Sequence, residues 1–364
     1  MKYANDCRVV LTLDAGGTNF VFSAIQGCKV AVEQVRLPAF AGDLDKCLET
    51  ICKGFKQTKE QASEEPVAIS FAFPGPADYP NGIIGDLANL PAFRGGVALG
   101  PLLEAEFGVP VFINNDGDLF AYGEAIAGLL PMINKKLAAE GNPKRFKNLL
   151  GVTLGTGFSG GIVRDGELFI GDNAAAGEIW CSRNKLYPTQ TVEESISIRG
   201  VRRVYAREAG IPFDDAPTPK RIYQIAQGDE DGNQAAAIES FREFGEVLGD
   251  TLVNAITLVD GLIVIGGGLA GAQEFFMPAL IQEMNSTINE PPACRMELKA
   301  FNLEDDGELD AFLKGETKEI TVSGTEKTVT FDSLKRVGVG VAVLDTSQAT
   351  SIGAYAFALN KLDG

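Results

Sequence analysis

The chain has 364 residues, a net charge of −17 and no histidine. A single hydrophobic core rarely serves a chain of this length, so we expect two domains. The negative charge disfavours nucleic acid and membrane surfaces as partners. The lack of histidine excludes Ser-His-Asp triads, Cys-His pairs and histidine-ligated zinc.

The first half of the chain alternates predicted strands with predicted helices. Apolar runs predict strands, and apolar residues spaced three and four apart predict helices. The predicted strands cover residues 8–13, 20–25, 29–36, 67–73 and 109–116, and the predicted helices cover 43–61 and 117–130. A glycine turn joins the first two strands into a hairpin.

The second half continues in the same way. It is predicted to contain a polar helix and loop at 134–147, three strands within 148–170, a helix at 233–259, a strand at 261–267, a helix at 273–289, a strand at 336–344 and a helix at 348–361. The polar residues 302–335 are predicted to form a surface insertion. Strands and helices alternate throughout, which predicts the α/β class.

The cysteines and the apolar segments indicate a cytoplasmic protein. None of the six cysteines forms a CxxC pair, and we interpret them as free thiols in a reducing compartment. The apolar run at 9–13 is hemmed in by charges and does not resemble a signal peptide. The longest apolar stretch, residues 261–272, is too short to cross a bilayer.

Three glycine-rich turns, at 14–19, 155–161 and 266–271, are candidate phosphate-binding sites, because backbone N–H groups can approach an anion where side chains are absent. Taken alone, the first fits an ordinary hairpin turn slightly better, although Asp14 is well placed there to hold Mg²⁺ through water. The second has more small residues than a turn requires. The third fits G-x-G-x-x-G, and three interpretations of it remain open: a dinucleotide site, an ordinary helix-entry turn, or a site for another nucleotide. Together they suggest a nucleotide held between two domains.

Asn115 and Asp116 lie where a predicted strand ends and a helix begins. Asn and Asp are favoured helix caps, so capping alone explains both residues. Ligands also bind at the carboxyl ends of strands in α/β proteins. Asp116 is therefore equally a candidate general base, with Asn115 orienting a substrate hydroxyl. In phosphoryl transfer such a base can accept the proton late.

Three further carboxylates lie in predicted loops. Glu178 and Glu193 are candidates to accept hydrogen bonds from sugar hydroxyls. For Glu194 we expect an ordinary solvated surface residue.

These motifs, in this order, resemble those of a sugar kinase of the ROK family, within the actin/hexokinase superfamily. LDAGGTN and VTLGTGFSGG are similar to its two phosphate motifs, and IVIGGGLAG to its adenosine motif. INNDGDLFAYGEA resembles the stretch with the catalytic Asp, FPGPADYPNGII followed by LANLP resembles the sugar-side loop, and AAAGEIW resembles the start of the sugar-binding Glu segment. The resemblance runs from about residue 8 to 361, with insertions near 131–148 and 302–335.

The resemblance implies a role for each matching residue. Asp116 is implied as the base, with Gly75, Asn89, Asn115, Asp116, Glu178 and Glu193 as sugar-binding residues. ATP is expected to contact Asp14, Gly16, Gly17, Thr18, Asn19, Gly155, Thr156, Gly157, Gly266, Gly267 and Gly268, and Asp14 is expected to hold Mg²⁺ through water. The family usually has a zinc-ligating His where this chain has Cys181, followed by a Cys-rich loop that residues 182–191 lack. We therefore predict no zinc site.

The resemblance implies two actin-like α/β domains that flank a nucleotide and sugar cleft. We expect residues 1–130 with the C-terminal helix 348–364 in one domain, and residues 131–347 in a larger one. The expected function is ATP-dependent phosphorylation of a hexose 6-hydroxyl, with glucose first and N-acetylhexosamines, mannose and fructose next. The expected partner is a small-molecule sugar, and a homodimer is the candidate assembly. The alternatives are a non-catalytic sugar sensor and a dinucleotide-dependent oxidoreductase.

Overall fold

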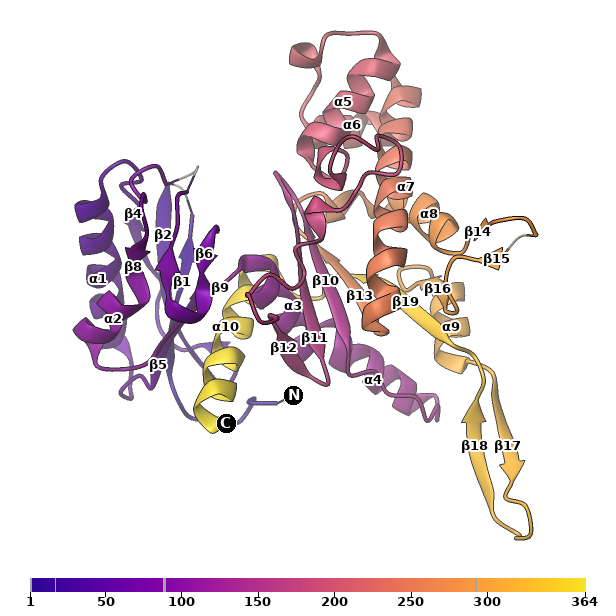
Figure 1. Cartoon of the computed structure of the whole chain (residues 1–364), viewed down its shortest axis with the longest axis horizontal. Helices are drawn as coiled ribbons and strands as arrows, with labels where there is room; N and C mark the ends of the chain where they lie inside the picture. Colours follow the sequence, from indigo (N-terminus) through magenta and orange to yellow (C-terminus); the bar gives the residue numbers. More distant parts are fainter. Residues whose placement is uncertain (1, 17, 88–89, 292) are drawn as a thin grey trace. The chain divides into compact units, whose positions relative to one another are not determined.

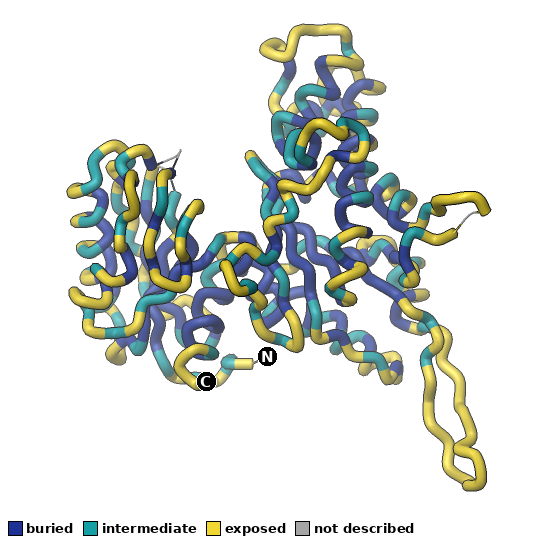
Figure 2. The backbone as a smooth tube through the Cα atoms, viewed as in Figure 1, coloured by how far each residue is buried: buried dark blue, intermediate teal, exposed yellow. Residues whose placement is uncertain are grey.

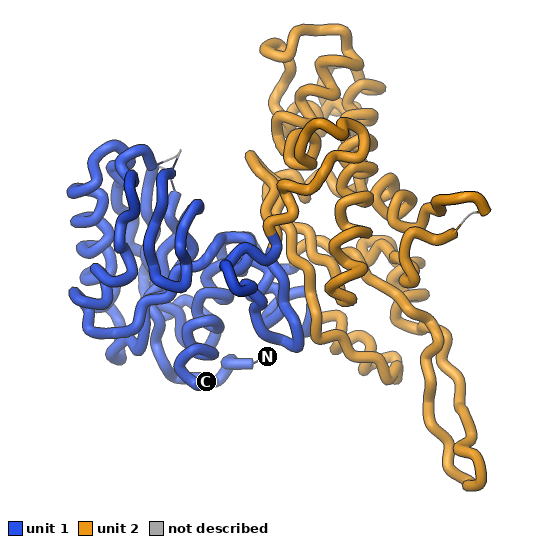
Figure 3. Tube along the Cα trace, in the orientation of Figure 1, with its two compact units in different colours: residues 1–131, 161–177, 343–364 blue, residues 132–160, 178–342 orange. Residues whose placement is uncertain are grey.

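The chain forms two compact units, which are drawn in different colours in Figure 3. The computed structural model describes residues 2–16, 18–87, 90–291 and 293–364. Unit 1 comprises residues 1–131, 161–177 and 343–364, and unit 2 comprises residues 132–160 and 178–342. Residues 161–177, expected in the second domain, are thus grouped with unit 1.

Unit 1 contains a mixed sheet with the strand order β3-β2-β1-β5-β9, and β4 also pairs with β2. The strands are β1 (Val10–Ala15), β2 (Asn19–Gln26), β3 (Lys29–Val30), β4 (Val35–Pro38), β5 (Ala68–Ala72) and β9 (Val111–Asn114). Strands β1 and β2 form the predicted antiparallel hairpin, whereas β1, β5 and β9 are parallel to one another.

The prediction of one strand at 29–36 is wrong. Val30 pairs with Ile25 and Val35 pairs with Phe22. Four residues therefore lie between the paired positions on this segment, whereas only two lie between them on β2. The extra residues leave the ladder, and the segment becomes two short strands on the same side of β2.

Helices cover both faces of the unit 1 sheet (Figure 1). Helices α1 (Leu44–Gln61) and α2 (Leu99–Phe107) share a core with the side chains of β1 and β2 that include Leu11 and Phe22. Alternate side chains of a strand point to opposite faces, and α10 (Thr346–Asp363) packs on β1, β2 and β5 and against α3 (Asp116–Ala127). Helix α2 had not been predicted. The loop before it contains η1 (Tyr79–Asn81) and a small sheet of β6 (Ala77–Asp78), β7 (Ile83–Ile84) and β8 (Val97–Ala98).

The predicted helix at 117–130 is two helices. Helix α3 ends at Ala127, and α4 (Leu129–Ala139) follows it directly. Gly128 separates them because its backbone, with φ −108° and ψ −122°, is not helical. Helix α4 also covers the start of the polar segment at 134–147, where a helix and a loop were predicted.

The second sheet has the strand order β12-β11-β10-β13-β19-β16. Its strands are β10 (Leu149–Leu154), β11 (Phe158–Arg164), β12 (Glu167–Phe169), β13 (Leu262–Gly266), β16 (Lys299–Asn302) and β19 (Arg336–Val341). Strands β10, β13, β19 and β16 are parallel. The first three also match predicted strands, because each is a run of apolar residues that the sheet buries.

Helix α7 (Gln234–Val259) confirms the clearest helix prediction and packs against α5, α6 and α8. The other helices of this unit are α5 (Ile198–Ala209), α6 (Pro219–Gln227), α8 (Gln273–Met284) and α9 (Asp306–Lys314), with short 3-10 turns η2 (Ile179–Cys181), η3 (Val192–Glu194), η4 (Phe213–Asp215) and η5 (Ala270–Ala272). The helix predicted at 273–289 ends at Met284, because β14 (Thr287–Ile288) then pairs with β15 (Ala293–Cys294).

The predicted surface insertion at 302–335 is only partly a surface structure. It contains α9, which buries Phe312 and Leu313. The hairpin of β17 (Thr317–Thr321) and β18 (Thr328–Asp332) is exposed along nearly its whole length (Figure 2). All six cysteines are free thiols, and no helix in the described part of the chain is long and apolar enough to cross a membrane.

Candidate functional site

The carboxyl edge of the unit 1 sheet collects most of the predicted site residues of that unit. Strands β1, β5 and β9 are parallel neighbours, with Asp14 opposite Ala72 and Ala72 opposite Asn114. Asp14 lies at the end of β1, Gly75 follows β5, and Asn115 and Asp116 follow β9. Parallel strands end at the same edge of a sheet, and the structure therefore brings these four residues to one place.

The Asp14 turn is a tight hairpin. A Cβ atom added to Gly16 would lie 2.9 Å from the backbone oxygen of Asn19, so the turn requires glycine there. The Asp14 carboxylate is exposed, and its Oδ2 accepts a hydrogen bond from Ser347 Oγ at 3.0 Å. Thr18 is also exposed, whereas Gly17 lies outside the described residues.

The residues after β9 divide the capping role and the candidate catalytic role between them. Asn115 is the N-cap of α3, and its side chain accepts a hydrogen bond from Gly117 N at 2.8 Å. Asp116 is the first helical residue, and its Oδ1 also accepts from Gly117 N at 2.8 Å. Because Asn115 already caps the helix, capping does not account for the carboxylate of Asp116.

The surroundings of Asp116 favour its protonated form. The residue keeps solvent-exposed surface, but the protein atoms around the carboxyl group displace water and raise its pKa. The backbone N–H groups of Gly117 and of Asp116 itself act in the opposite direction, and the negative charge of Asp14 raises the pKa further. A raised pKa is the usual property of a carboxylate that accepts and releases protons near neutral pH.

Gly75 lies in a loop that is anchored to the same edge. Phe73 N donates to Asn114 O at 3.0 Å, and Tyr79 Oη donates to Phe73 O at 3.0 Å. A Cβ atom on Gly75 would lie 3.0 Å from Tyr79 Oη, which leaves little room for a side chain. The predicted sugar ligand Asn89 lies outside the described residues.

The two glycine turns of unit 2 also lie side by side. Strands β10 and β13 are parallel, with Thr153 opposite Gly266, so the turns at 155–157 and 266–268 follow neighbouring strand ends. Gly267 has φ +87°, and a Cβ atom there would lie 2.4 Å from the backbone oxygen of Leu154. Added Cβ atoms on Gly155 and Gly268 would meet nothing within 4 Å. In these turns Gly267 is therefore packed closely against the neighbouring backbone, whereas the backbone at Gly155 and Gly268 has open space beside it.

Glu193 is tied to the first of these turns. Its Oε2 accepts a hydrogen bond from Phe158 N at 3.0 Å, and a Cβ atom on Gly157 would lie 2.8 Å from the same oxygen. Its Oε1 accepts from Arg199 Nη2 at 2.9 Å. The structure therefore holds this carboxylate at the start of β11, in contact with the predicted phosphate turn.

Glu194, predicted to be a solvated surface residue, has a structural role instead. Its Oε1 pairs with Arg199 at 2.7 Å and its Oε2 pairs with Arg203 at 2.7 Å. Hydrogen bonds from Arg199 and then from Arg203 lower the pKa of Glu194 to about 2. These ion pairs link η3 to the first turns of α5, and η3 carries Glu193.

Glu178 precedes η2, which contacts η3. Its exposed carboxylate accepts a hydrogen bond from Trp180 Nε1, and its backbone oxygen accepts from Cys181 Sγ at 3.0 Å. No group of three or more His, Cys, Asp or Glu side chains in the described ranges is placed to hold a metal ion. The lack of a zinc site stays a prediction, which elemental analysis of the purified protein would test.

Two residues at this site were missed by sequence reasoning. Ser347 donates to Asp14 across 333 positions of the sequence, and the sequence around it shows only a helix start after Asp345. Arg199 holds Glu193 from the first turn of α5, and because the two residues lie in different elements no single helical or strand periodicity links them. Both contacts depend on tertiary packing.

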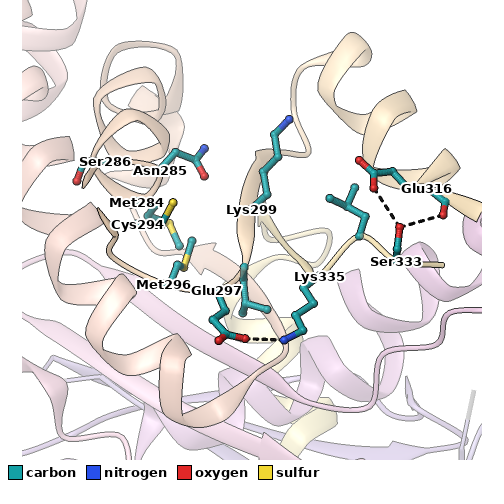
Figure 4. Close-up of a pocket in the computed structure, with 12 residues that line it drawn as sticks. Met284, Asn285, Ser286, Cys294, Met296, Glu297, Lys299, Glu316, Ser333 and Lys335 are labelled. Carbon is teal, nitrogen blue, oxygen red and sulfur yellow. Dashed lines mark hydrogen bonds and ion pairs between the residues drawn. The ribbon is translucent and has the colours of Figure 1, made fainter. Parts of the chain in front are cut away.

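A cavity of about 580 Å³ lies elsewhere in unit 2 and contains none of the predicted site residues (Figure 4). Met284, Cys294 and Met296 line it, together with Lys335, which is paired with Glu297 at 2.5 Å. It is formed near the ends of α8 and β18, and no residue of the glycine turns lines it.

The sheets, their strand order and the glycine turns at the strand ends define an actin-like α/β fold. The chain matches the ROK family over residues 10–310 and belongs to that family. It is 31% identical to the N-acetyl-D-glucosamine kinase of Photobacterium profundum, over 71% of this chain and 83% of that protein.

Solved structures support the same assignment. A glucokinase from Parabacteroides distasonis is 56% identical, with a TM-score of 0.91 and 99% of each chain covered. A ROK family glucokinase from Streptomyces griseus, solved with glucose and AMPPNP, is 17% identical, with a TM-score of 0.58 and coverage of 96% of this chain and 98% of that one. The second likeness concerns the fold alone.

Proposed function

We propose that this protein transfers the γ-phosphate of ATP to the 6-hydroxyl of a hexose, with glucose as the first candidate. The observation that carries this proposal is the Asp116 carboxylate, which has a raised pKa, is not needed as a helix cap and lies at the same sheet edge as Asp14. The names of the relatives, which include glucokinase and N-acetyl-D-glucosamine kinase, support a sugar as the acceptor.

In this proposal Asp116 acts as the general base. Its carboxylate accepts the proton of the sugar 6-hydroxyl while the hydroxyl oxygen bonds to the γ-phosphorus and the bond to the ADP oxygen breaks. Asn115, fixed by its cap on α3, orients the hydroxyl. Glu178 and Glu193 accept hydrogen bonds from other sugar hydroxyls, and the Gly75 loop lines the sugar site.

The phosphates of ATP would contact the glycine turns. Gly155 and Gly268 leave open space beside the backbone, and a phosphate group can therefore come close to their N–H groups. Asp14 fits a Mg²⁺ site because it presents an exposed carboxylate, oriented through Ser347, beside the first turn. When bound, Mg²⁺ would neutralise charge on the phosphate oxygens.

A coupled assay of ADP release across glucose, N-acetylglucosamine, N-acetylmannosamine, mannose and fructose tests the proposal. We expect turnover with at least one of these sugars, and the highest kcat/KM with glucose. Sugar binding without turnover on any of them would favour the sensor alternative. A rise in melting temperature with NAD and none with Mg-ATP would support the oxidoreductase alternative instead, because a ligand that binds the native state stabilises it.

A further inference from the structure

A second cavity of about 510 Å³ lies wholly within unit 1. It is formed by one face of the sheet, from β1 through β2 to β3 and β4, and by the first two turns of α10. Asp14 is at one end, and Cys28 and Lys29 are at the other. A cavity of this size falls within the usual range for small-molecule sites.

The floor of this cavity contains a buried hydroxyl group that has no partner. Ser23 lines the cavity and is only 4% exposed, and its Oγ makes no hydrogen bond. Its neighbour Thr12 is satisfied, because Thr12 Oγ1 donates to Ser23 O at 3.4 Å. Buried polar atoms are nearly always paired in folded proteins, so an unpaired one that faces a cavity indicates a missing ligand or water.

Two cationic side chains, Lys29 and Arg36, lie among the residues that line the cavity. Both side chains are exposed, and neither forms a hydrogen bond or ion pair with another side chain in the described part of the chain. The two carboxylates that also line it are engaged: Asp14 accepts from Ser347 Oγ at 3.0 Å, and Asp345 accepts from Ser347 N at 3.0 Å. Both carboxylates keep their negative charge, but Lys29 and Arg36 are the charged groups of the lining that are left to pair with an anionic ligand.

The remaining lining is hydroxyl and amide. Besides Thr12 and Ser23, it includes Gln34, Gln348 and Ser351. Such groups both donate and accept, and they match the hydroxyl groups of a sugar. No aromatic side chain lines the cavity within the described residues, so nothing here would stack on a nucleobase.

We propose that this cavity is a binding site for a small phosphorylated sugar, with Arg36 and Lys29 on the phosphate and Ser23 on a sugar hydroxyl. This inference rests on the proposed function only for the choice of a hexose 6-phosphate as the probe. The site differs from the predicted ATP turn, because the cavity is not lined by Gly16, Thr18 or Asn19. Asp14 alone is shared, and a ligand in the cavity would therefore adjoin the predicted magnesium ligand.

Calorimetric titration with glucose 6-phosphate, without nucleotide or Mg²⁺ and at constant ionic strength, tests the site. The substitution Arg36→Gln should weaken the binding about 10–100-fold, the usual effect of losing charged hydrogen bonds to a phosphate. Ser23→Ala should weaken it about 5-fold, the effect of one neutral hydrogen bond. Glucose 6-phosphate that binds at the proposed catalytic residues would not be affected by these two substitutions. The difference in affinity between wild type and variant therefore reports binding in the cavity alone.

Matched controls are available in the same unit. Ser70 is also a buried serine with an unpaired Oγ, but it does not line the cavity, so Ser70→Ala should leave glucose 6-phosphate binding unchanged. Arg164, an exposed arginine at the end of β11, provides Arg164→Gln as the control for charge. Equal melting temperatures of the four variants would show that the fold is intact.

Equal affinity of wild type, Arg36→Gln and Ser23→Ala for glucose 6-phosphate would overturn the proposal. Inorganic phosphate that binds as tightly as glucose 6-phosphate, with the same dependence on Arg36, would also overturn it by showing a simple anion site. The failure of the proposed function is a separate outcome: a wild-type protein without ADP release in the sugar panel can still show Arg36-dependent binding.

Discussion

The substitution Asp116→Asn separates the catalytic role proposed for this side chain from any role in the fold. Asn115 is the N-cap of α3, and the bond from Gly117 N to Asp116 Oδ1, at 2.8 Å, can be accepted equally by the amide oxygen of asparagine. The helix should therefore keep both of its N-terminal acceptors. Only the charge and the proton-accepting oxygen are removed.

The expected loss in kcat is about 10²–10⁴-fold, the usual contribution of a positioned general base. This corresponds to about 3–5 kcal/mol in activation free energy. The free energy of unfolding should change by less than about 1 kcal/mol, the upper value for one charge at an exposed helix N-terminus. Burial disfavours the charged form of Asp116, which offsets even this change.

The raised pKa of Asp116 gives both effects a pH dependence. The base must be ionised, so wild-type kcat should fall as pH drops below the raised pKa. The free energy of unfolding behaves in the opposite way, because the folded state binds the Asp116 proton more tightly than the unfolded state does. The stability that this proton gives is fully present below the ordinary pKa of Asp and is lost as pH rises through the raised pKa. Asp116→Asn has no proton to bind at this position, so its stability relative to wild type should increase as pH rises between these two pKa values.

The measurements are coupled ADP release for kcat and urea unfolding for stability. Asp305→Asn is a matched control, because Asp305 is the N-cap of α9 and its Oδ1 accepts from Glu308 N at 2.9 Å. The control should change neither kcat nor stability appreciably, since Asn caps about as well as Asp. A stable Asp116→Asn protein with wild-type kcat would refute the assignment of Asp116 as the base.

Two further substitutions test the supports of the site. Arg199→Met removes the ion pair that holds Glu193, so KM for the sugar should rise about tenfold while kcat changes less. The control Arg203→Met loses contacts to Glu194 alone and should leave KM near wild type. Equal KM values for the two variants would contradict the positioning role of Arg199. Gly267→Ala forces a side chain into a positive-φ position against the backbone and should lower the unfolding free energy by about 1–3 kcal/mol. Gly271→Ala meets open space, so urea unfolding should show a smaller loss, and equal losses would argue against the close-packing explanation.

Much of the local structure could be predicted from the sequence. The apolar run of β13 and the apolar stripe of α7 each specify one element, because burial of a strand or of one helix face requires that spacing. The glycine turns at 155–157 and 266–268 could also be found, since their residues are contiguous. Local reasoning failed where pairing with another segment decided the outcome, as in the division of 29–36 into β3 and β4.

The candidate site could be predicted in part. Asp14, Asn115 and Asp116 follow strands, and parallel pairing is enough to place them at one edge. The sequence alone left the choice between cap and base open at Asp116. The structure makes Asn115 the N-cap, because its backbone is extended while Asp116 is already the first helical residue, although both side chains accept from Gly117 N.

The contacts that hold these groups in place were decided by tertiary structure alone. Ser347 reaches Asp14 because α10 packs on the sheet of unit 1, and Arg199 reaches Glu193 because α5 begins beside η3. The cavity beside Ser23 is likewise a product of this packing, because the first turns of the same helix bound it together with β1, β2 and β4. Sequence patterns specify which face of an element is buried, but the partner that covers it is selected by long-range packing, which no local periodicity records.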